Sequence, residues 1–360
     1  MKNTFFDSLM ISDSERVHTQ TLAWIISLDD SVFPSNKKKQ FLSKLFNVNG
    51  EIRFEQNIYV ETEFNKIDLF IDTDNYQFLL ENKLKSSEHS NQTFRYIDAI
   101  PSQFEDANKT RIYGFLTLVK DEPLNQEWIP ISFEKLKDSL KEVTWNDSQK
   151  ETVFIKEYIQ TLGNLTDVYN GFIDNHRNYA NVFTDGSKKK YEKERYENDL
   201  QDYIRRNQLE TIFQKAFLKA ILKNAEIEYI EIGETRGTAL FQTHISEINI
   251  AGEIFRLGFQ FQGKSMKINL VHKNYADSKP EQVGEKLMKI FKNVFYQKND
   301  YNTLNKPRKK AYVSVSKILT NEIFDIDKSA LIELLQKEIK YSNVKVKEFE
   351  NLINTEYKNV

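Results

Sequence analysis

Residues 66–83 show the alternation of apolar and polar positions that is typical of two β-strands joined by a tight turn. Apolar side chains occupy every second position from Ile67 to Ile71, the period of a strand with one buried face. The next four residues, Asp72 to Asn75, are of the types that hydrogen-bond their own backbone in turns. A second apolar run follows from Phe78 to Leu80. We therefore predict an antiparallel hairpin here, preceded by another strand within residues 52–63.

The rest of the first half alternates helical and strand-like segments. Helical periodicity is found at residues 12–28, 38–46, 86–99, 134–143 and 147–169, and apolar runs typical of buried strands are found at 111–119 and 128–133. Because a predicted helix separates the hairpin from the 111–119 strand, that strand should run parallel to its neighbour in the sheet. Residues 1–180 are therefore expected to form a mixed β-sheet flanked by helices, an α/β (α+β) fold.

The pattern changes after the segment Asp185-Gly186-Ser187. A helical stretch at 191–224 is followed by short alternating segments at 227–232, 239–245, 248–250, 254–261 and 265–271, which predict an antiparallel meander. One more strand is predicted at 312–318, and helices at 280–296 and 328–339. We therefore expect two domains, residues 1–185 and residues 186–360. The second is a C-terminal α+β domain whose pattern does not specify whether it serves in binding or in dimerisation.

Composition narrows the chemistry that this chain can carry. With 360 residues, of which 39% are hydrophobic, it can bury a large core and form two domains. It has no cysteine, so disulfides and thiolate metal sites are excluded, and any metal must be held by oxygen or histidine. No segment approaches the roughly 20 apolar residues of a membrane span. We expect a soluble, cytoplasmic protein without a membrane partner.

The charge balance gives no strong indication of a polyanionic partner. The 51 basic and 53 acidic residues leave a net charge of −2. Local basic clusters do occur, and each is either a solvated surface or a phosphate contact: Lys188, Lys189 and Lys190, and Arg308, Lys309 and Lys310. A nuclease can nevertheless be near neutral, because bound divalent cations supply positive charge where carboxylates would repel phosphate.

Three charged side chains share one face of the predicted hairpin. Because side chains alternate along a strand, Asp68 lies on the face opposite to that of Ile67 and Leu69. On the next strand, Glu81 and Lys83 share one face. A turn centred between residues 73 and 74 would put Asp68 opposite Leu79, with Glu81 as its diagonal neighbour roughly 7–8 Å away. That arrangement suits a hard divalent cation held by two carboxylates, with the lysine beside it. The alternative is an exposed cross-strand pair of little energetic consequence.

Two neighbouring helices carry further candidates. Glu15 lies three residues after Ser12, so it is either a capping side chain or an acid that projects into a site formed by later strands. Gln92 and Tyr96 are four residues apart, on one helical face next to Arg95. They form either an ordinary exposed face or a pair in which Gln92 hydrogen-bonds substrate or metal-bound water.

Asp68, the run Glu81-Asn82-Lys83 and the following Gln92 together resemble the motif of the PD-(D/E)XK nuclease superfamily. The resemblance covers roughly the first half of the chain and implies a restriction-endonuclease-like order of helix, three strands, helix and strand. The acidic first helix and the spacing from Gln92 to Tyr96 look like a bacterial branch of this superfamily. Ile67 replaces the proline of the motif's name, a part of the motif that is often not kept.

The resemblance also implies roles for these residues. Asp68 and Glu81 would bind Mg²⁺ or Mn²⁺, Glu15 would complete the metal site, and Lys83 would orient or help to deprotonate the attacking water. Gln92 would be the helix residue of the motif, with Tyr96 accessory to it.

The expected activity is hydrolysis of DNA phosphodiester bonds, in bacterial restriction, defence or repair. The alternative is a catalytically inactive nuclease-fold protein that binds nucleic acid or a protein partner. A homodimer that uses the second half as its interface is a further hypothesis.

Overall fold

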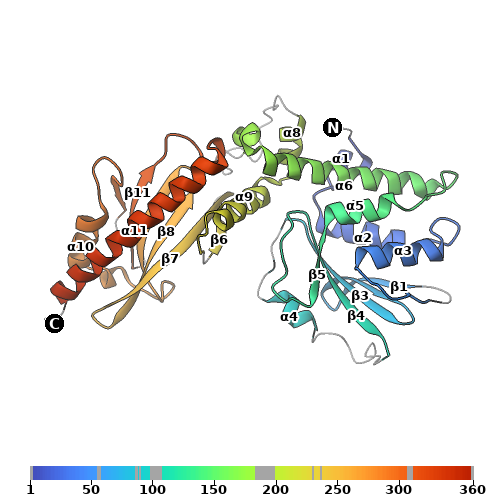
Figure 1. The fold of residues 1–360 in the computed structure, drawn as a ribbon, viewed down its shortest axis with the longest axis horizontal. Coiled ribbons are helices and arrows are strands. Elements are labelled where there is room, and N and C mark those ends of the chain that lie inside the picture. Colours follow the sequence, from blue (N-terminus) through green and yellow to red (C-terminus); the bar gives the residue numbers. More distant parts are fainter. Residues whose placement is uncertain are drawn as a thin grey trace. The chain divides into compact units, whose positions relative to one another are not determined.

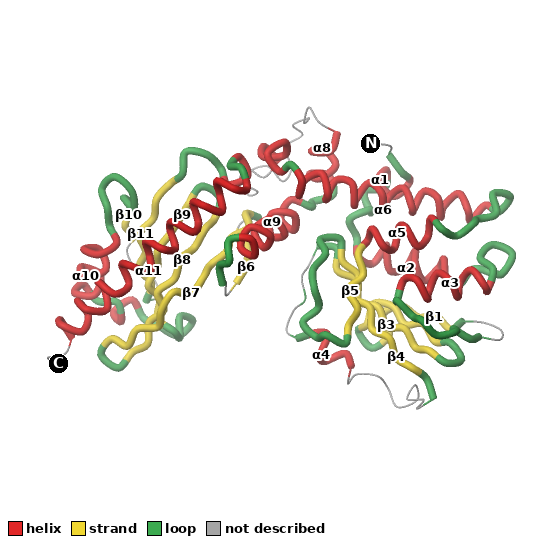
Figure 2. The backbone as a smooth tube through the Cα atoms, viewed as in Figure 1, coloured by secondary structure: helices red, strands yellow, loops and turns green. Residues whose placement is uncertain are grey.

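Two β-sheets, each flanked by helices, form the core of the structure, a computed structural model (Figures 1 and 2). It describes residues 3–54, 58–85, 88, 91–97, 108–182, 199–228, 231–235, 237–305 and 311–357. The predicted mixed α+β class is confirmed. Residues Met1–Asp174 with Arg195–Ile212 form one compact unit, and residues Asn175–Glu194 with Phe213–Val360 form the other. The predicted boundary at 185–187 and both basic clusters (188–190 and 308–310) lie outside the described residues.

The sheet of the first unit has five strands in the order β1-β2-β3-β4-β5. They are β1 (Tyr59–Phe64), β2 (Ile67–Asp72), β3 (Tyr76–Lys83), β4 (Thr110–Thr117) and β5 (Trp128–Ser132). The first three strands pair antiparallel, whereas β3, β4 and β5 pair parallel. The crossover predicted between β3 and β4 is therefore confirmed, because only a crossover connection returns the chain in the same direction. β1 occupies the end of the predicted 52–63 strand segment and extends one residue beyond it.

Helices of the first unit pack on the sheet and on one another. They are α1 (Phe5–Ser8), α2 (Glu15–Ile26), α3 (Ser35–Leu45), α4 (Gln92–Ile97), α5 (Phe133–Lys141), α6 (Lys150–Asp174) and α8 (Asp199–Arg206). α2 buries Leu22, Ile25 and Ile26 and contacts β1, β2 and β3. α5 contacts both α3 and α6, so these three helices pack as one group. α8 contacts α6, and Asn207 just after it accepts a hydrogen bond of 2.9 Å from the Ser12 hydroxyl. This segment is therefore part of the first unit, although it follows the domain boundary that the sequence predicts at residues 185–187.

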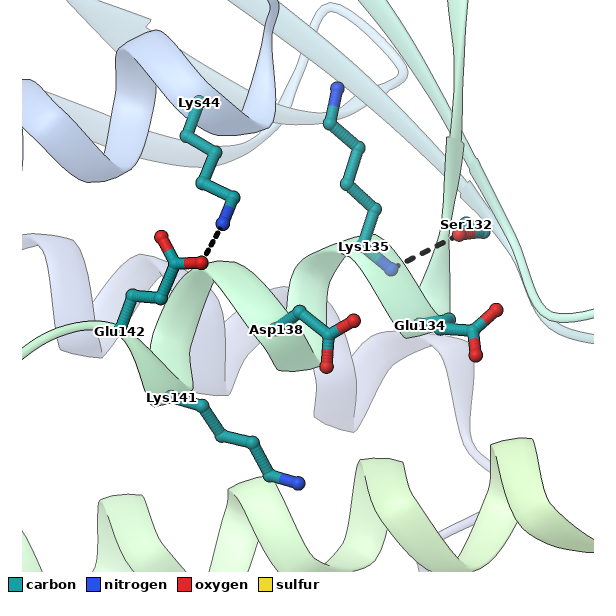
Figure 3. A pocket seen from close by; sticks show the side chains of 7 residues that line it. All are labelled: Lys44, Ser132, Glu134, Lys135, Asp138, Lys141 and Glu142. Carbon is teal, nitrogen blue, oxygen red and sulfur yellow. Dashed lines mark hydrogen bonds and ion pairs between the residues drawn. The ribbon is translucent and has the colours of Figure 1, made fainter.

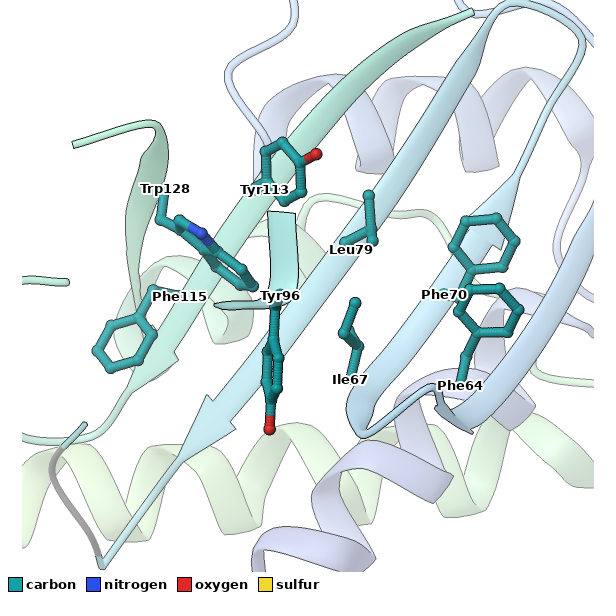
Figure 4. Packing of buried hydrophobic residues seen from close by; sticks show 8 residues of the cluster. All are labelled: Phe64, Ile67, Phe70, Leu79, Tyr96, Tyr113, Phe115 and Trp128. Atoms are coloured by element: carbon teal, nitrogen blue, oxygen red, sulfur yellow. The ribbon is translucent and has the colours of Figure 1, made fainter. Parts of the chain in front are cut away.

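The two faces of the first sheet are covered differently. On one face Gly114 of β4 is in close contact with its surroundings, because an added Cβ would lie 2.7–2.9 Å from Phe46, Ile131 and Leu80. The opposite face carries an aromatic cluster (Figure 4). Its members are Phe64, Ile67, Phe70, Leu79, Tyr96, Tyr113, Phe115 and Trp128. Tyr96 comes from α4, so this helix covers the sheet on the face to which Leu79 points.

The second unit contains a six-stranded antiparallel sheet in the order β10-β11-β9-β8-β7-β6. Its strands are β6 (Glu231–Thr235), β7 (Thr238–Ile250), β8 (Glu253–Gln262), β9 (Ser265–His272), β10 (Thr303–Asn305) and β11 (Tyr312–Ile318). The helices include α9 (Glu210–Asn224, in this unit from Phe213 on), α10 (Glu285–Phe295) and α11 (Lys328–Tyr357). The unit also contains the 3₁₀ segments η2 (His176–Val182), η3 (Pro280–Gln282) and η4 (Ile323–Asp325). The predicted meander is confirmed.

Two details of the second unit differ from prediction. The segments predicted as separate strands at 239–245 and 248–250 form one strand, β7, with a register shift between His244 and Ser246. A bulge of this kind interrupts the alternation without ending the strand. α11 continues past Ile339, where buried Ser342, Val346 and Phe349 prolong its packed stripe. No helix in the described part of the chain is long and apolar enough to cross a membrane.

Candidate active site at the end of the central strand

The β2–β3 register places Asp68 and Glu81 one position beyond the last paired residues of the two strands, Leu69 and Leu80. Leu69 pairs with Leu80 and Phe70 with Leu79, so one further pair in the same register is Asp68 with Glu81. The predicted register, with Asp68 opposite Leu79, is therefore wrong by two residues. The cause is the turn, in which the Thr73 N–H donates to the Tyr76 carbonyl at 2.9 Å and the Tyr76 N–H donates to the Thr73 hydroxyl at 3.0 Å. The predicted common face of the two carboxylates is confirmed.

The Asp68 carboxylate is fixed by the backbone of the neighbouring strand. Its Oδ2 accepts the Asn82 N–H at 2.7 Å. Burial raises the pKa of Asp68, and the Asn82 hydrogen bond acts in the opposite direction. The Asn82 side chain points away to α2, where its amide donates to the Glu15 carbonyl at 2.9 Å and to the Thr19 hydroxyl at 3.2 Å.

Glu81 is the most deeply buried charged group at this place, with 1% of its surface exposed. Its Oε1 accepts from the Lys83 ammonium at 2.7 Å and from the Gln92 amide at 2.6 Å. Its Oε2 is buried and has no hydrogen-bond partner among the described residues. Burial, followed by the charge of Asp68, raises the pKa of Glu81 to about 7, although Lys83 opposes the shift. Near neutral pH this carboxyl is therefore available to either a proton or a cation.

Lys83 carries the positive charge of the cluster. Burial alone would lower the pKa of its ammonium group, but Glu81, Glu15 and Asp68 outweigh that effect and raise the pKa. The group is therefore protonated at neutral pH. In this state it can stabilise negative charge or hold a water molecule, and it cannot accept a proton.

Glu15 reaches the end of β3 from the start of α2. Its Oε1 accepts the N–H groups of Leu84 at 2.8 Å and Lys85 at 2.9 Å. The capping interpretation is wrong, because the N-cap is Ser14 and its side chain makes no capping bond. Asp13 adds an ion pair with the Lys85 ammonium. The start of α2 thus holds the backbone that directly follows Lys83, and the Glu15 carboxylate lies near enough to influence the pKa of Glu81 and Lys83.

α4 brings Gln92 and Tyr96 to the same place. One Gln92 amide nitrogen donates to Glu81, as described above, and to the Tyr96 hydroxyl at 2.5 Å. The sequence predicts a helix over 86–99, whereas the described helix is limited to Gln92–Ile97. The interpretation of Gln92 and Tyr96 as an exposed face is wrong, because both side chains are buried.

Sequence reasoning missed the residues that hold α4 in position. Glu88 Oε1 accepts the N–H and the hydroxyl of Thr93 at 2.8 and 2.6 Å, and its Oε2 accepts the Leu124 N–H at 2.8 Å. Thr93 in turn accepts the Asn125 N–H through its hydroxyl at 3.2 Å and the Trp128 indole N–H through its carbonyl at 2.9 Å. We call these residues the α4 clamp. An acidic residue just before a helix is a capping pattern, and Glu88 could have been noticed on that basis.

The donor set fits a hard divalent cation. Asp68 and Glu81 supply carboxylate oxygens, which Mg²⁺ and Mn²⁺ prefer, and the buried Oε2 of Glu81 is an acceptor without a donor. Within the described ranges no group of three or more acidic or histidine side chains is arranged to hold a metal ion. Two carboxylates completed by water or substrate oxygens are compatible with Mg²⁺, which usually keeps several waters.

A separate open pocket of about 550 Å³ lies on α3 and α5 (Figure 3). It is lined by Lys44, Ser132, Glu134, Lys135, Asp138, Lys141 and Glu142. Lys44 pairs with Glu142, and the Lys135 ammonium donates to the Asn47 side chain at 2.6 Å. Asp68, Glu81 and Lys83 do not line this pocket, and its charges are of both signs, so we assign it no part in the site.

Comparison with known proteins agrees with the geometry. A family model described as the PD-(D/E)XK nuclease superfamily matches residues 3–160. The search of curated proteins and the search of solved structures return no match. Residues 3–160, the part of the chain that this family model covers, contain the five-stranded sheet and the candidate site. The resemblance seen in the sequence is confirmed, and its fold is the restriction-endonuclease-like one.

Proposed function

We propose that this protein is a Mg²⁺- or Mn²⁺-dependent nuclease that hydrolyses DNA phosphodiester bonds, with a role in bacterial restriction, defence or repair. The observation that carries the proposal is the Glu81 carboxylate. It follows the last β2–β3 pair beside Asp68, is paired with Lys83, and keeps one buried oxygen that no described residue donates to. The match to the nuclease superfamily supports nucleic acid as the substrate class.

Each residue of the site has its own role in the proposed reaction. Asp68 and Glu81 would hold the cation, with Glu15 next to them at the end of β3. A bound divalent cation supplies a Lewis acid that activates water and offsets the charge of the phosphate. Lys83 presents a protonated ammonium that stabilises the charge developing on the phosphoryl oxygens. Gln92 holds Glu81 in place, and Tyr96 holds Gln92. The expected products carry 5′-phosphate and 3′-hydroxyl ends.

Cleavage assays test this proposal directly. Plasmid, linear duplex, single-stranded and branched DNA are incubated with Mg²⁺ or Mn²⁺ and the wild-type, Asp68→Ala or Lys83→Ala protein. Lys109→Ala is the matched control, since Lys109 pairs with Asp72 at 2.8 Å on the same sheet but outside the site. We expect cleavage by the wild type and the control only. Undiminished cleavage by both site variants would exclude this site.

A second candidate is a nuclease-fold protein that binds nucleic acid or a protein partner without chemistry. It is favoured by the occupation of Glu81 Oε1 by Lys83 and Gln92, and of Glu15 Oε1 by two backbone N–H groups. Under this hypothesis Mg²⁺ leaves the melting temperature unchanged, whereas a metal site stabilises the folded state by mass action.

A homodimer with one site on each subunit would suit double-strand cleavage. Light scattering of the full chain tests this hypothesis, and a strict monomer contradicts it.

A further inference from the structure

Helix α4 has an outward face that the site does not use. Gln92, Thr93 and Tyr96 are buried toward the sheet and the clamp, whereas Phe94 and Arg95 are exposed. Phe94 exposes 50% of its surface to solvent, and Leu124 of the clamp exposes 57%. An apolar ring and a cation therefore face solvent on the helix that delivers Gln92 to Glu81.

The described residues make no use of either side chain in holding the fold. Within the described part of the chain Arg95 makes no ion pair and no side-chain hydrogen bond, and Phe94 makes no ring contact. Two other cations near the site are each paired with a carboxylate: Lys83 with Glu81, and Lys85 with Asp13. The Arg95 guanidinium is thus free to pair with an external anion.

The backbone that carries these two residues is fixed. The clamp bonds hold Thr93, the residue before Phe94, to Glu88, Asn125 and Trp128. On the other side of Phe94 and Arg95, the hydrogen bond from Gln92 holds Tyr96. The ring and the guanidinium are therefore presented from a short helix anchored at both ends, which lowers the entropic cost of binding.

We propose that Phe94 and Arg95 bind an unpaired strand of nucleic acid next to the catalytic residues, with a base stacked on Phe94 and a phosphate paired with Arg95. In the interior of an undistorted duplex both faces of each base are covered by its neighbours, whereas an unpaired base offers an open face on which an exposed ring can stack without unstacking a base pair. Arginine provides a bidentate contact to a phosphate and adds cation–π contact with bases. This inference rests on the proposed function and gives it a substrate class, DNA with single-stranded segments.

Binding of fluorescent oligonucleotides to the full chain tests the proposal. Affinities for a single strand and for the blunt duplex of the same sequence are measured by anisotropy with EDTA, so that hydrolysis plays no part. Phe94→Leu removes the ring but keeps an apolar side chain, and Phe94→Trp restores a ring. Phe154→Ala is the matched control, because Phe154 is 47% exposed and lies on α6 of the same unit.

We expect Phe94→Leu to weaken single-strand binding about 5- to 100-fold, the usual loss of one stacked base. Duplex binding should stay within about twofold, Phe94→Trp should restore single-strand binding, and Phe154→Ala should have no effect. Arg95→Gln should reduce the slope of log affinity against log salt concentration by about 0.7 for the single strand. Equal behaviour of Phe94→Leu and Phe154→Ala, or an equal loss for single strand and duplex, would overturn the inference.

The outcome is separable from that of the proposed function. Cleavage that depends on Asp68 and Lys83 but is indifferent to Phe94→Leu on every substrate overturns this inference and leaves the nuclease in place. The protein could also bind single strands through the Phe94 ring and cleave no substrate. That result supports this inference and contradicts the proposed nuclease activity.

Discussion

The Lys83 ammonium lies 2.7 Å from Oε1 of Glu81, and the two side chains leave the same face of β3 two residues apart. The Gln92 amide donates to the same oxygen, and the other oxygen of Glu81 is buried with no donor in the part of the chain that the structure describes. A buried carboxylate with half of its acceptors unused is unfavourable unless a proton or a cation joins it. The predictions below about pH and metal follow from this arrangement.

Stability without metal should depend on pH through Glu81. Its pKa is about 7 in the folded protein against 4.5 for an ordinary glutamate. Below pH 4.5 the Glu81 carboxyl is protonated in both the folded and the unfolded protein. As pH rises to 7 it ionises only in the unfolded protein, so the free energy of unfolding falls by about 3 kcal/mol. Urea unfolding in EDTA from pH 4.5 to 8 should show this loss in the wild type and a smaller one in Glu81→Gln.

The effect of Glu81 is the difference between the free energies of unfolding of the wild type and Glu81→Gln. The difference is needed because His18 changes stability with pH in the opposite direction. Burial lowers the pKa of His18 to about 4, so its contribution to stability is lost as pH falls from 6.5 toward 4. Nε2 of His18 lies 2.8 Å from the Ser12 carbonyl, and Glu81→Gln leaves both groups unchanged, so this contribution should cancel in the difference. Parallel curves for wild type and Glu81→Gln would contradict the assignment to Glu81.

Metal binding should compete with the proton on Glu81. Mg²⁺ should raise the melting temperature, and the concentration that gives half of the rise should increase up to about tenfold for each pH unit below 7. Glu81→Gln and Asp68→Asn should abolish the response. Asp72→Asn is the control, because Asp72 lies on β2 but pairs with Lys109. A rise that is independent of pH, or that persists in Glu81→Gln, would place the metal elsewhere.

Loss of the clamp should weaken catalysis without removing the metal. Glu88→Ala leaves the N–H groups of Thr93 and Leu124 without their acceptor, so α4 is no longer held and Gln92 loses its position against Glu81. We expect kcat to fall by 10-fold or more, as for other small misplacements at active sites, with the Mg²⁺-induced rise in melting temperature retained.

Glu88→Gln should have an intermediate effect on kcat, because the amide oxygen still accepts from Thr93 while its nitrogen cannot accept from Leu124. Glu122→Ala serves as the control, because Glu122 is exposed and lies in the loop that carries Leu124. Equal activity of Glu88→Ala and Glu122→Ala would remove the positioning role of the clamp.

The packed face of the sheet gives a stability prediction that does not involve the site. Gly114→Ala inserts a methyl group within 3 Å of Phe46, Ile131 and Leu80, and overpacking of this kind destabilises by about 1–3 kcal/mol. Gly163→Ala on α6 is the control, since its nearest neighbour would be 3.8 Å away and alanine favours a helix. Denaturant midpoints measure both. A Gly114→Ala protein as stable as wild type would show that the sheet shifts to accommodate the methyl group.

The local pattern was sufficient to predict that Asp68, Glu81 and Lys83 share a face, and that β3 and β4 run parallel. Side chains on a strand alternate with a period of two, so which of them share a face follows from sequence numbers alone. The helix between β3 and β4 likewise requires a crossover. For the same reason Asn82 could be assigned to the opposite face, where the structure shows it bonded to α2.

Only the tertiary structure decided which residues meet across elements. The turn at Thr73–Asn75 sets the register that brings Asp68 opposite Glu81, and a shift by two residues leaves the alternation of faces unchanged. Glu15 bonds to the end of β3 over a separation of about 70 residues, and Glu88 joins α4 to the loop that carries Leu124. Such contacts depend on how distant segments pack, and no local pattern contains that information. The sequence by itself therefore determined the set of chemical groups on the face of β3, and the packing of α2 and α4 decided how those groups are held.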